Sequence, residues 1–141
     1  MSEVAPSTSK KRILVVDDDP VILKAISIKL KAQGHDVLTA SDGSTAVTTV
    51  RTTKPDLIVL DISFPPDFGN ISWDGFRIME WLKRIDEVTN TPIIIVTGGD
   101  PAKYEAHAMQ LGASAFFRKP INHEKFFETI RQLLAHVTVT A

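Results

Sequence analysis

The sequence predicts an α/β protein in which helices cover both faces of a parallel sheet, giving a three-layer sandwich. Two observations support this prediction: short apolar runs alternate with stretches of helical periodicity, and most of the runs are rich in β-branched side chains. Such runs between helices are typical of parallel strands that are buried on both faces. The predicted strands are residues 13–16, 36–40, 57–60, 93–96 and 115–117.

Five helices are predicted between and after these strands. Asp19 and Pro20 begin the first helix, because a carboxylate can cap it and proline suits its first turn, and Gly34 ends it. Asp42 begins the second helix, and the Lys54-Pro55 pair closes it. The other three helices are predicted to begin near Asp74, Pro101 and Asn122.

Apolar residues recur at helical spacing within each of these segments, which predicts the side chains that face the sheet. Trp81 lies among such positions, and we interpret it as a packing residue. The four histidines are interpreted as surface residues, because no two of them have the spacing of a metal-binding pair. The predicted inward-facing residues are Ile22, Leu23, Ile26, Leu30, Ala46, Val47, Val50, Phe76, Met79, Leu82, Ile85, Tyr104, Ala108, Leu111, Phe127, Ile130, Leu134 and Val137.

Length and composition indicate one globular domain. The chain has 141 residues, of which 43% are hydrophobic, and a formal net charge of −1. This charge gives no reason to expect direct binding of nucleic acid or of an anionic membrane surface. The absence of cysteine fits a cytoplasmic location, and no apolar stretch reaches the roughly 18 residues of a membrane span. We expect a disordered lead-in over residues 1–11, one domain over 12–137 and a tail over 138–141.

Acidic residues follow two of the predicted strands. Asp17 and Asp18 come after the first strand and Asp61 after the third, and the carboxyl ends of parallel strands form the usual ligand site of such sheets. Carboxylates held this close repel one another, so we expect a cation among them, and the set suits Mg²⁺. Helix capping is the alternative role, and we expect it for Asp19. It does not explain why a second acid ends a different strand.

Three further features indicate phosphoryl chemistry at the same edge of the sheet. Asp61 is followed by a turn rather than a helix, and its carboxylate can act as a nucleophile toward phosphorus. Thr97 offers a hydroxyl to a phosphate oxygen, and Lys119 offers a charge that offsets the negative charge of the transferring group. Taken alone, Thr97 could be an ordinary strand-end hydroxyl and Lys119 a solvated lysine. Their placement at successive strand ends favours the functional interpretation.

Five segments together resemble the receiver domain of two-component response regulators. They are ILVVDDDP at 13–20, PDLIVLD at 55–61, DG at 74–75, PIIIVT at 92–97 and LGASAFFRKP at 111–120. The resemblance implies a flavodoxin-like (βα)5 fold with strand order 2-1-3-4-5. It also implies a cis peptide bond between Lys119 and Pro120.

The same resemblance implies roles for individual residues. Asp61 would be the phosphoacceptor, and Asp17, Asp18 and Asp61 would hold Mg²⁺ (or Mn²⁺), with Asp18 the more direct ligand of the first pair. Ser63 would add its backbone carbonyl to the metal. Thr97 and Lys119 would bind the phosphoryl group.

The resemblance further implies a signalling switch rather than an enzyme that turns over an external substrate. It would catalyse only its own phosphorylation and dephosphorylation. A sensor histidine kinase or a histidine phosphotransfer protein would supply the phosphoryl group. Phosphorylation would alter the face formed by residues from about 101 to 137, which an unknown downstream protein would bind. The chain could be a stand-alone receiver or part of a larger protein, and a monomer or a phosphorylation-dependent homodimer.

Two departures from the family pattern concern the switch and the partner. Six additional residues precede Asp74, and the enlarged loop carries Phe68, Ile71 and Trp73. These side chains could select a partner or set the lifetime of the phosphoryl group, or they could pack within the loop itself. Phe116 stands where the family often has a tyrosine, so switching would depend on Thr97 and on packing rather than on a tyrosine hydrogen bond.

The alternative hypothesis is a haloacid-dehalogenase-like phosphatase. The segment DDDPV after the first strand resembles its motif, with Asp17 as nucleophile and Asp19 as general acid. That family needs a further acidic pair after its lysine, and only Glu124 and Glu128 follow Lys119, both within a predicted helix. No glycine-rich nucleotide-binding motif follows any strand.

Overall fold

The computed structural model describes residues 11–61, 75–84, 90–98 and 101–139. Five strands alternate with five helices, as predicted. The strands are β1 (Arg12–Val16), β2 (Asp36–Ala40), β3 (Leu57–Asp61), β4 (Ile93–Thr97) and β5 (Ala115–Arg118). The helices are α1 (Pro20–Ala32), α2 (Gly43–Thr53), α3 (Gly75–Lys83), α4 (Pro101–Gln110) and α5 (His123–Val139).

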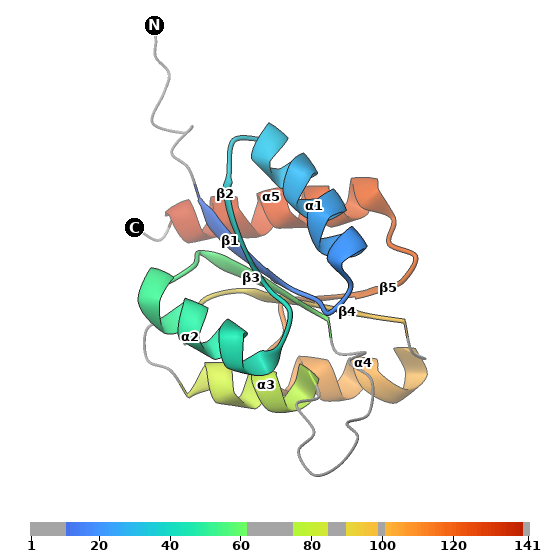
Figure 1. The fold of residues 1–141 in the computed structure, drawn as a ribbon. Helices are drawn as coiled ribbons and strands as arrows, with labels where there is room; N and C mark the ends of the chain where they lie inside the picture. Colours follow the sequence, from blue (N-terminus) through green and yellow to red (C-terminus); the bar gives the residue numbers. More distant parts are fainter. Residues whose placement is uncertain (1–10, 62–74, 85–89, 99–100, 140–141) are drawn as a thin grey trace, which may run out of the picture.

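The strands form one parallel sheet in the order β2-β1-β3-β4-β5, which confirms the predicted topology. Helices α1 and α5 lie on one face of the sheet, and α2, α3 and α4 lie on the other (Figure 1). Because the strands are parallel and in register, their carboxyl ends meet at one edge of the molecule.

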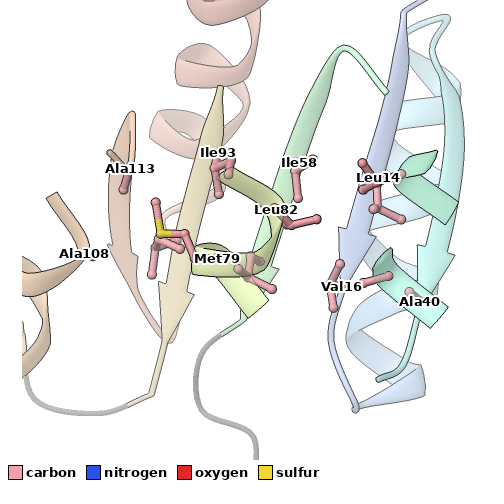
Figure 2. Packing of buried hydrophobic residues seen from close by; sticks show 13 residues of the cluster. Leu14, Val16, Ala40, Ile58, Met79, Leu82, Ile93, Ala108 and Ala113 are labelled. Atoms are coloured by element: carbon pink, nitrogen blue, oxygen red, sulfur yellow. The ribbon is translucent and has the colours of Figure 1, made fainter. Parts of the chain in front are cut away.

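Two hydrophobic cores lie on opposite faces of the sheet. Alternate residues of a strand point to opposite faces, so Ile13 and Val15 pack against α1 and α5, while Leu14 and Val16 pack on the other side. Figure 2 shows the second core, in which Met79 from α3 lies over the central strands. The strands of the sheet centre are completely buried, which explains why they read as continuous apolar runs.

Three helices start at the predicted capping residues. The Asp19 carboxylate accepts a hydrogen bond from the Val21 N–H at 2.9 Å, and the Asp42 carboxylate accepts one from the Thr45 N–H at 2.7 Å. The Asn122 side chain accepts a bond from the Lys125 N–H at 3.2 Å. The capping prediction for Asp19 is therefore confirmed.

The structure corrects three details of the predicted packing. In α5, Phe126 is the fully buried aromatic residue and Phe127 is only half-buried, so the inward stripe runs at i, i+4 and i+8 through Ile130 and Leu134. Trp81 is 42% exposed rather than part of the core. His35 is half-buried, and its Nδ1 atom is buried, so it lies only partly at the surface.

Two observations concern the limits of the fold. Helix α5 continues to Val139, past the expected domain boundary at residue 137. Within the described ranges, no helix has the length and apolar character needed to cross a membrane.

The correction in α5 predicts unequal effects of two neighbouring substitutions. The Phe126 ring is fully buried and packs edge-on against Phe117, with ring centroids 5.4 Å apart. Phe126→Ala should therefore lower the free energy of unfolding by about 3–5 kcal/mol, measured by urea denaturation. Phe127→Ala should cost less than about 2 kcal/mol, because that ring is only half-buried. A larger loss for Phe127→Ala would contradict the observed orientation of α5.

Candidate functional site

Three carboxylates meet at the carboxyl ends of β1 and β3. Asp17 directly follows β1, and Asp61 is the last residue of the neighbouring strand β3, so the pairing of these strands places the two side chains together. Asp18 adds the third carboxylate. One oxygen atom from each of the three groups lies within 4.8 Å of the others. The structure thus brings together the three acids that the sequence predicts as a metal site.

Lys119 bridges the two buried carboxylates of this cluster. Its Nζ atom lies 3.2 Å from Asp17 Oδ2 and 3.0 Å from Asp61 Oδ2, and it forms an ion pair with each. Lys119 follows β5 in the sequence, and its backbone N–H donates a hydrogen bond to the Thr97 carbonyl at 2.8 Å. The Lys119–Pro120 peptide bond is cis, as the resemblance implies.

Burial distinguishes the three acids. Asp17 is 3% exposed and Asp61 is 2% exposed, whereas Asp18 is exposed to solvent. The pKa of Asp17 is raised from 3.8 to about 6, first because burial disfavours its charge and also because the Asp61 carboxylate repels it. Hydrogen bonds from the Asp19 N–H, at 2.9 Å, and from Lys119 offset only part of this effect. The site therefore holds more negative charge than its own residues neutralise.

Lys119 supplies the only positive charge that the structure places in contact with these acids among the described residues. Burial alone lowers the pKa of Lys119, but its hydrogen bonds and ion pairs with Asp61 and Asp17 raise it overall. Three carboxylates with one ammonium leave an acidic cluster of oxygen ligands, which is the chemistry of a Mg²⁺ site. The residues present thus fit a hard divalent cation.

Thr97 and Phe116 lie on the strands next to this cluster. Thr97 is the last residue of β4 and is 1% exposed, and in the register of β3 and β4 it comes one position after the partner of Asp61. Phe116 is half-buried in β5, pairs with Ile95 of β4 and packs against the core on the α3 side of the sheet. The Gly98 position that follows Thr97 is exposed.

Four predicted site residues fall outside the part of the chain that the structure describes. Ser63, with its expected backbone carbonyl ligand, belongs to this group, and so do Phe68, Ile71 and Trp73 of the enlarged loop.

The phosphatase alternative conflicts with the geometry. Asp19 would have to act as a general acid, but its carboxylate accepts the capping bond from Val21. Glu124 and Glu128 line a groove on α5 together with Phe117, and the acidic cluster found among the described residues does not include them. The additional acids that this alternative requires are therefore not at the site.

An apolar groove beside the cluster was missed by the sequence analysis. It has a volume of about 250 Å³ and is bounded by α1 and by the segment that joins β5 to α5. Val21, which is 73% exposed, forms part of its wall, and Lys119 and Pro120 form another part. A strongly apolar residue immediately after the capping Asp19-Pro20 pair was the sequence signal that could have indicated it.

Comparison with known proteins identifies the family that shares these features. The profile of the response regulator receiver domain matches residues 13–131. Protein PilH of Pseudomonas aeruginosa is 33% identical over 88% of this chain and 98% of its own length. The polar-differentiation response regulator DivK of Brucella anthropi is 31% identical over 88% of this chain and 96% of its own length. The chain spans only about half of other relatives, such as the transcriptional regulatory protein PhoP of Bacillus subtilis, which is 32% identical over 93% of this chain and 51% of its own length.

Solved structures show the same architecture. A CheY-like receiver domain protein from Methanospirillum hungatei superposes with a TM-score of 0.83 at 26% identity, covering 94% of this chain and 100% of that one. The chemotaxis response regulator CheY4 of Vibrio cholerae gives a TM-score of 0.77 at 26% identity, covering 89% of this chain and 99% of that one.

The charge imbalance predicts that Asp17→Asn stabilises the metal-free protein at pH 7. The substitution removes a buried charge that the fold disfavours, and one pKa unit corresponds to about 1.4 kcal/mol. We therefore expect the free energy of unfolding to rise by an amount on the order of 1–3 kcal/mol. Urea denaturation in the presence of a chelator measures this change.

The gain in the free energy of unfolding from Asp17→Asn should depend on pH. The folded-state pKa of Asp17 is raised, so its proton stabilises the fold below about pH 4, and this stabilisation is lost as the pH rises through about 6. The difference between Asp17→Asn and the wild type should therefore shrink from pH 7 toward pH 4. Asp42→Asn, which keeps a capping side chain on α2, is the matched control and should show no such trend. Equal stability of Asp17→Asn and wild type at every pH would contradict the conclusion that the fold disfavours the charge of Asp17.

Proposed function

The chain belongs to the response regulator receiver domain family, and on this premise we propose that Asp61 is the residue that accepts the phosphoryl group. The protein is a phospho-accepting switch of two-component signalling and not a conventional enzyme. A receiver domain implies a cognate histidine kinase. Whether the kinase itself or a histidine phosphotransfer protein is the direct donor is part of the proposal.

One observation carries this assignment: Lys119 Nζ lies 3.0 Å from Asp61 Oδ2 inside a cluster of three carboxylates. The ion pair places an ammonium directly against the Asp61 carboxylate within a buried setting. The same ammonium is close enough to neutralise charge that develops on a phosphoryl group transferred to that oxygen. Asp61 therefore has both a nucleophile's position and an electrostatic partner.

The proposed transfer is an in-line displacement at phosphorus. An oxygen of the Asp61 carboxylate forms the new O–P bond while the P–N bond of the donor phosphohistidine breaks. The electron pair of the broken bond stays on the imidazole of the donor. Lys119 remains beside the acceptor oxygen and offsets the negative charge that arrives with the phosphoryl group.

Asp17, Asp18 and Asp61 would hold Mg²⁺, with Mn²⁺ as a possible substitute, and Ser63 would contribute its carbonyl. When bound, the cation supplies positive charge to the oxygens of the transferring group. The unneutralised charge of the cluster and the raised pKa of Asp17 support this part of the proposal.

The conformational change caused by phosphorylation would be transmitted from Asp61 to β4 and β5. The Thr97 hydroxyl would bind the new phosphoryl oxygens, and the hydrogen bond from the Lys119 N–H to the Thr97 carbonyl links the ends of the two strands. We expect a change at Thr97 to be transmitted along β5 to Phe116 and to the face between about residues 101 and 137. A downstream protein, or a second phosphorylated copy, would bind this face, and the loop with Phe68, Ile71 and Trp73 stays a predicted contributor to partner choice.

Removal of the acceptor tests the central assignment. Radiolabelled acetyl phosphate with Mg²⁺ should label the wild type with a hydroxylamine-labile group, as expected of an acyl phosphate. Asp61→Asn should reduce this labelling on the order of 1,000-fold or more, because the nucleophile is lost. Asp42→Asn, the matched control at an exposed capping aspartate, should be labelled like the wild type. Persistent labelling of Asp61→Asn, or loss only in an Asp17 variant, would contradict the proposal.

Replacement of the switch hydroxyl tests the conformational part. Thr97→Ala should still bind beryllofluoride, but the amide resonances of β5 should shift much less than in the wild type. Thr97→Ser keeps the hydroxyl and should restore the shifts, which separates loss of the hydrogen bond from loss of packing. Nuclear magnetic resonance of labelled protein measures both effects, and full shifts in Thr97→Ala would overturn this step.

A further inference from the structure

Strand β2 forms a free edge of the sheet. The sheet order places β2 at one end, and its only partner strand is β1. Edge strands in natural proteins are often protected by short length, by charged side chains (lysine above all), by proline or by a bulge. The five residues of β2, from Asp36 to Ala40, include neither lysine nor proline, and their register with β1 is uninterrupted.

The backbone of β2 exposes a defined set of hydrogen-bonding groups. The Asp36 N–H donates to the Lys11 carbonyl, and the Ala40 carbonyl accepts from the Asp17 N–H, so the even-numbered residues of β2 face β1. In a parallel pair the alternate residues face the other way. The N–H and C=O groups of Val37 and Thr39 therefore point to the free edge, and no described residue pairs with them through the backbone.

A groove of about 720 Å³ lies along the first half of this edge. The end of α1, the start of β2 and the end of α2 form its walls. Val37 and Leu38 are both half-buried and belong to the cores on opposite faces of the sheet, so the groove offers apolar contact above and below the strand. Its volume lies in the range typical of ligand sites in proteins.

The charged groups of the groove are mostly basic. The side chain of Lys31, on the side of α1, makes no ion pair or hydrogen bond with the described residues, although its backbone carbonyl accepts a bond from the Gly34 N–H. The Arg12 guanidinium, on the side of α2, makes one hydrogen bond to the Thr53 carbonyl and keeps further donors. Asp36 also lines the groove, and Asp56 bonds to the Arg12 N–H. His35 completes the titratable lining, and Lys11 lies near enough to act electrostatically on it.

We propose that the β2 edge and this groove are a docking site for an extended acidic segment of a partner protein, which adds to the sheet as a sixth strand. The backbone of that segment would pair with Val37 and Thr39, a mode known as β-augmentation. Acidic side chains on its two faces would meet Lys31 and Arg12. The two cations on opposite sides of the strand are the observation that favours an acidic occupant.

This site is separate from the phosphoacceptor. The groove includes Arg12, the first residue of β1, whereas Asp17 follows the last residue of that strand. Five residues of strand separate the two positions by about 16 Å. The segment would therefore dock without covering the acidic cluster, and the proposal does not depend on Asp61 being phosphorylated.

Amide hydrogen exchange of the full chain provides the test. In the free protein, the Val37 and Thr39 amides should exchange faster than the Leu38 amide, which is bonded to β1. A capped octapeptide of glutamate and valine should slow Val37 and Thr39 by about tenfold or more at millimolar concentration and leave Leu38 unchanged. Lys31→Glu should weaken binding about two- to fivefold, whereas Lys24→Glu, an exposed lysine on the same helix outside the groove, should not.

Four results would overturn the proposal. The first is no protection of Val37 and Thr39 at millimolar peptide, or slow exchange of both amides before peptide is added. The second is equal protection by a matched peptide of lysine and valine. The third is the same protection by free glutamate at equal carboxylate concentration, which would indicate a small-anion site. The fourth is protection that rises with protein concentration alone, which would identify a second copy as the occupant.

Discussion

The functional site depends on two buried carboxylates that share one ammonium. Asp17 and Asp61 lie at the carboxyl ends of adjacent strands because β1 and β3 pair in parallel, and both side chains are buried. Lys119 binds both, yet the pKa of Asp17 is still raised to about 6. The fold thus keeps an unfavourable charge in place, and a cation that binds the folded protein there would relieve this cost and raise the free energy of unfolding.

The scaffold can hold this charge because the rest of the sheet is apolar. The central strands β3 and β4 are buried along their whole length, with apolar cores on both faces, and Asp61 is the last residue of one of them. The Asp19 cap adds a second constraint, because its N–H bonds to Asp17 while its carboxylate bonds to Val21. One short turn therefore fixes both a helix end and a carboxylate of the site.

The residue pattern was sufficient for the alternation of parallel strands with helices and for the residues of the cluster, whereas the strand order was implied only by the family resemblance. A short continuous apolar run between helices is typical of a buried parallel strand, and acids that end neighbouring strands meet at one edge of the sheet. The sequence was insufficient where two neighbouring residues could each face the core. The pair Phe126-Phe127 fits a helical stripe in either register, and only packing against Phe117 selects Phe126. The groove at the β2 edge could not be predicted, because it is formed by the ends of α1 and α2, which are distant in sequence from Arg12.

Lys119 contacts the site through its side chain and β4 through its backbone, so it can couple a change at Asp61 to the ends of β4 and β5. Its side chain forms an ion pair with Asp61, while its backbone N–H donates to the carbonyl of Thr97, the residue that follows the β4 partner of Asp61. A phosphoryl group on Asp61 would compete for the ammonium and attract the hydroxyl. Both changes would act on the same junction of β4 and β5, so under the proposed mechanism the added charge would displace β5 rather than be compensated by a single side chain.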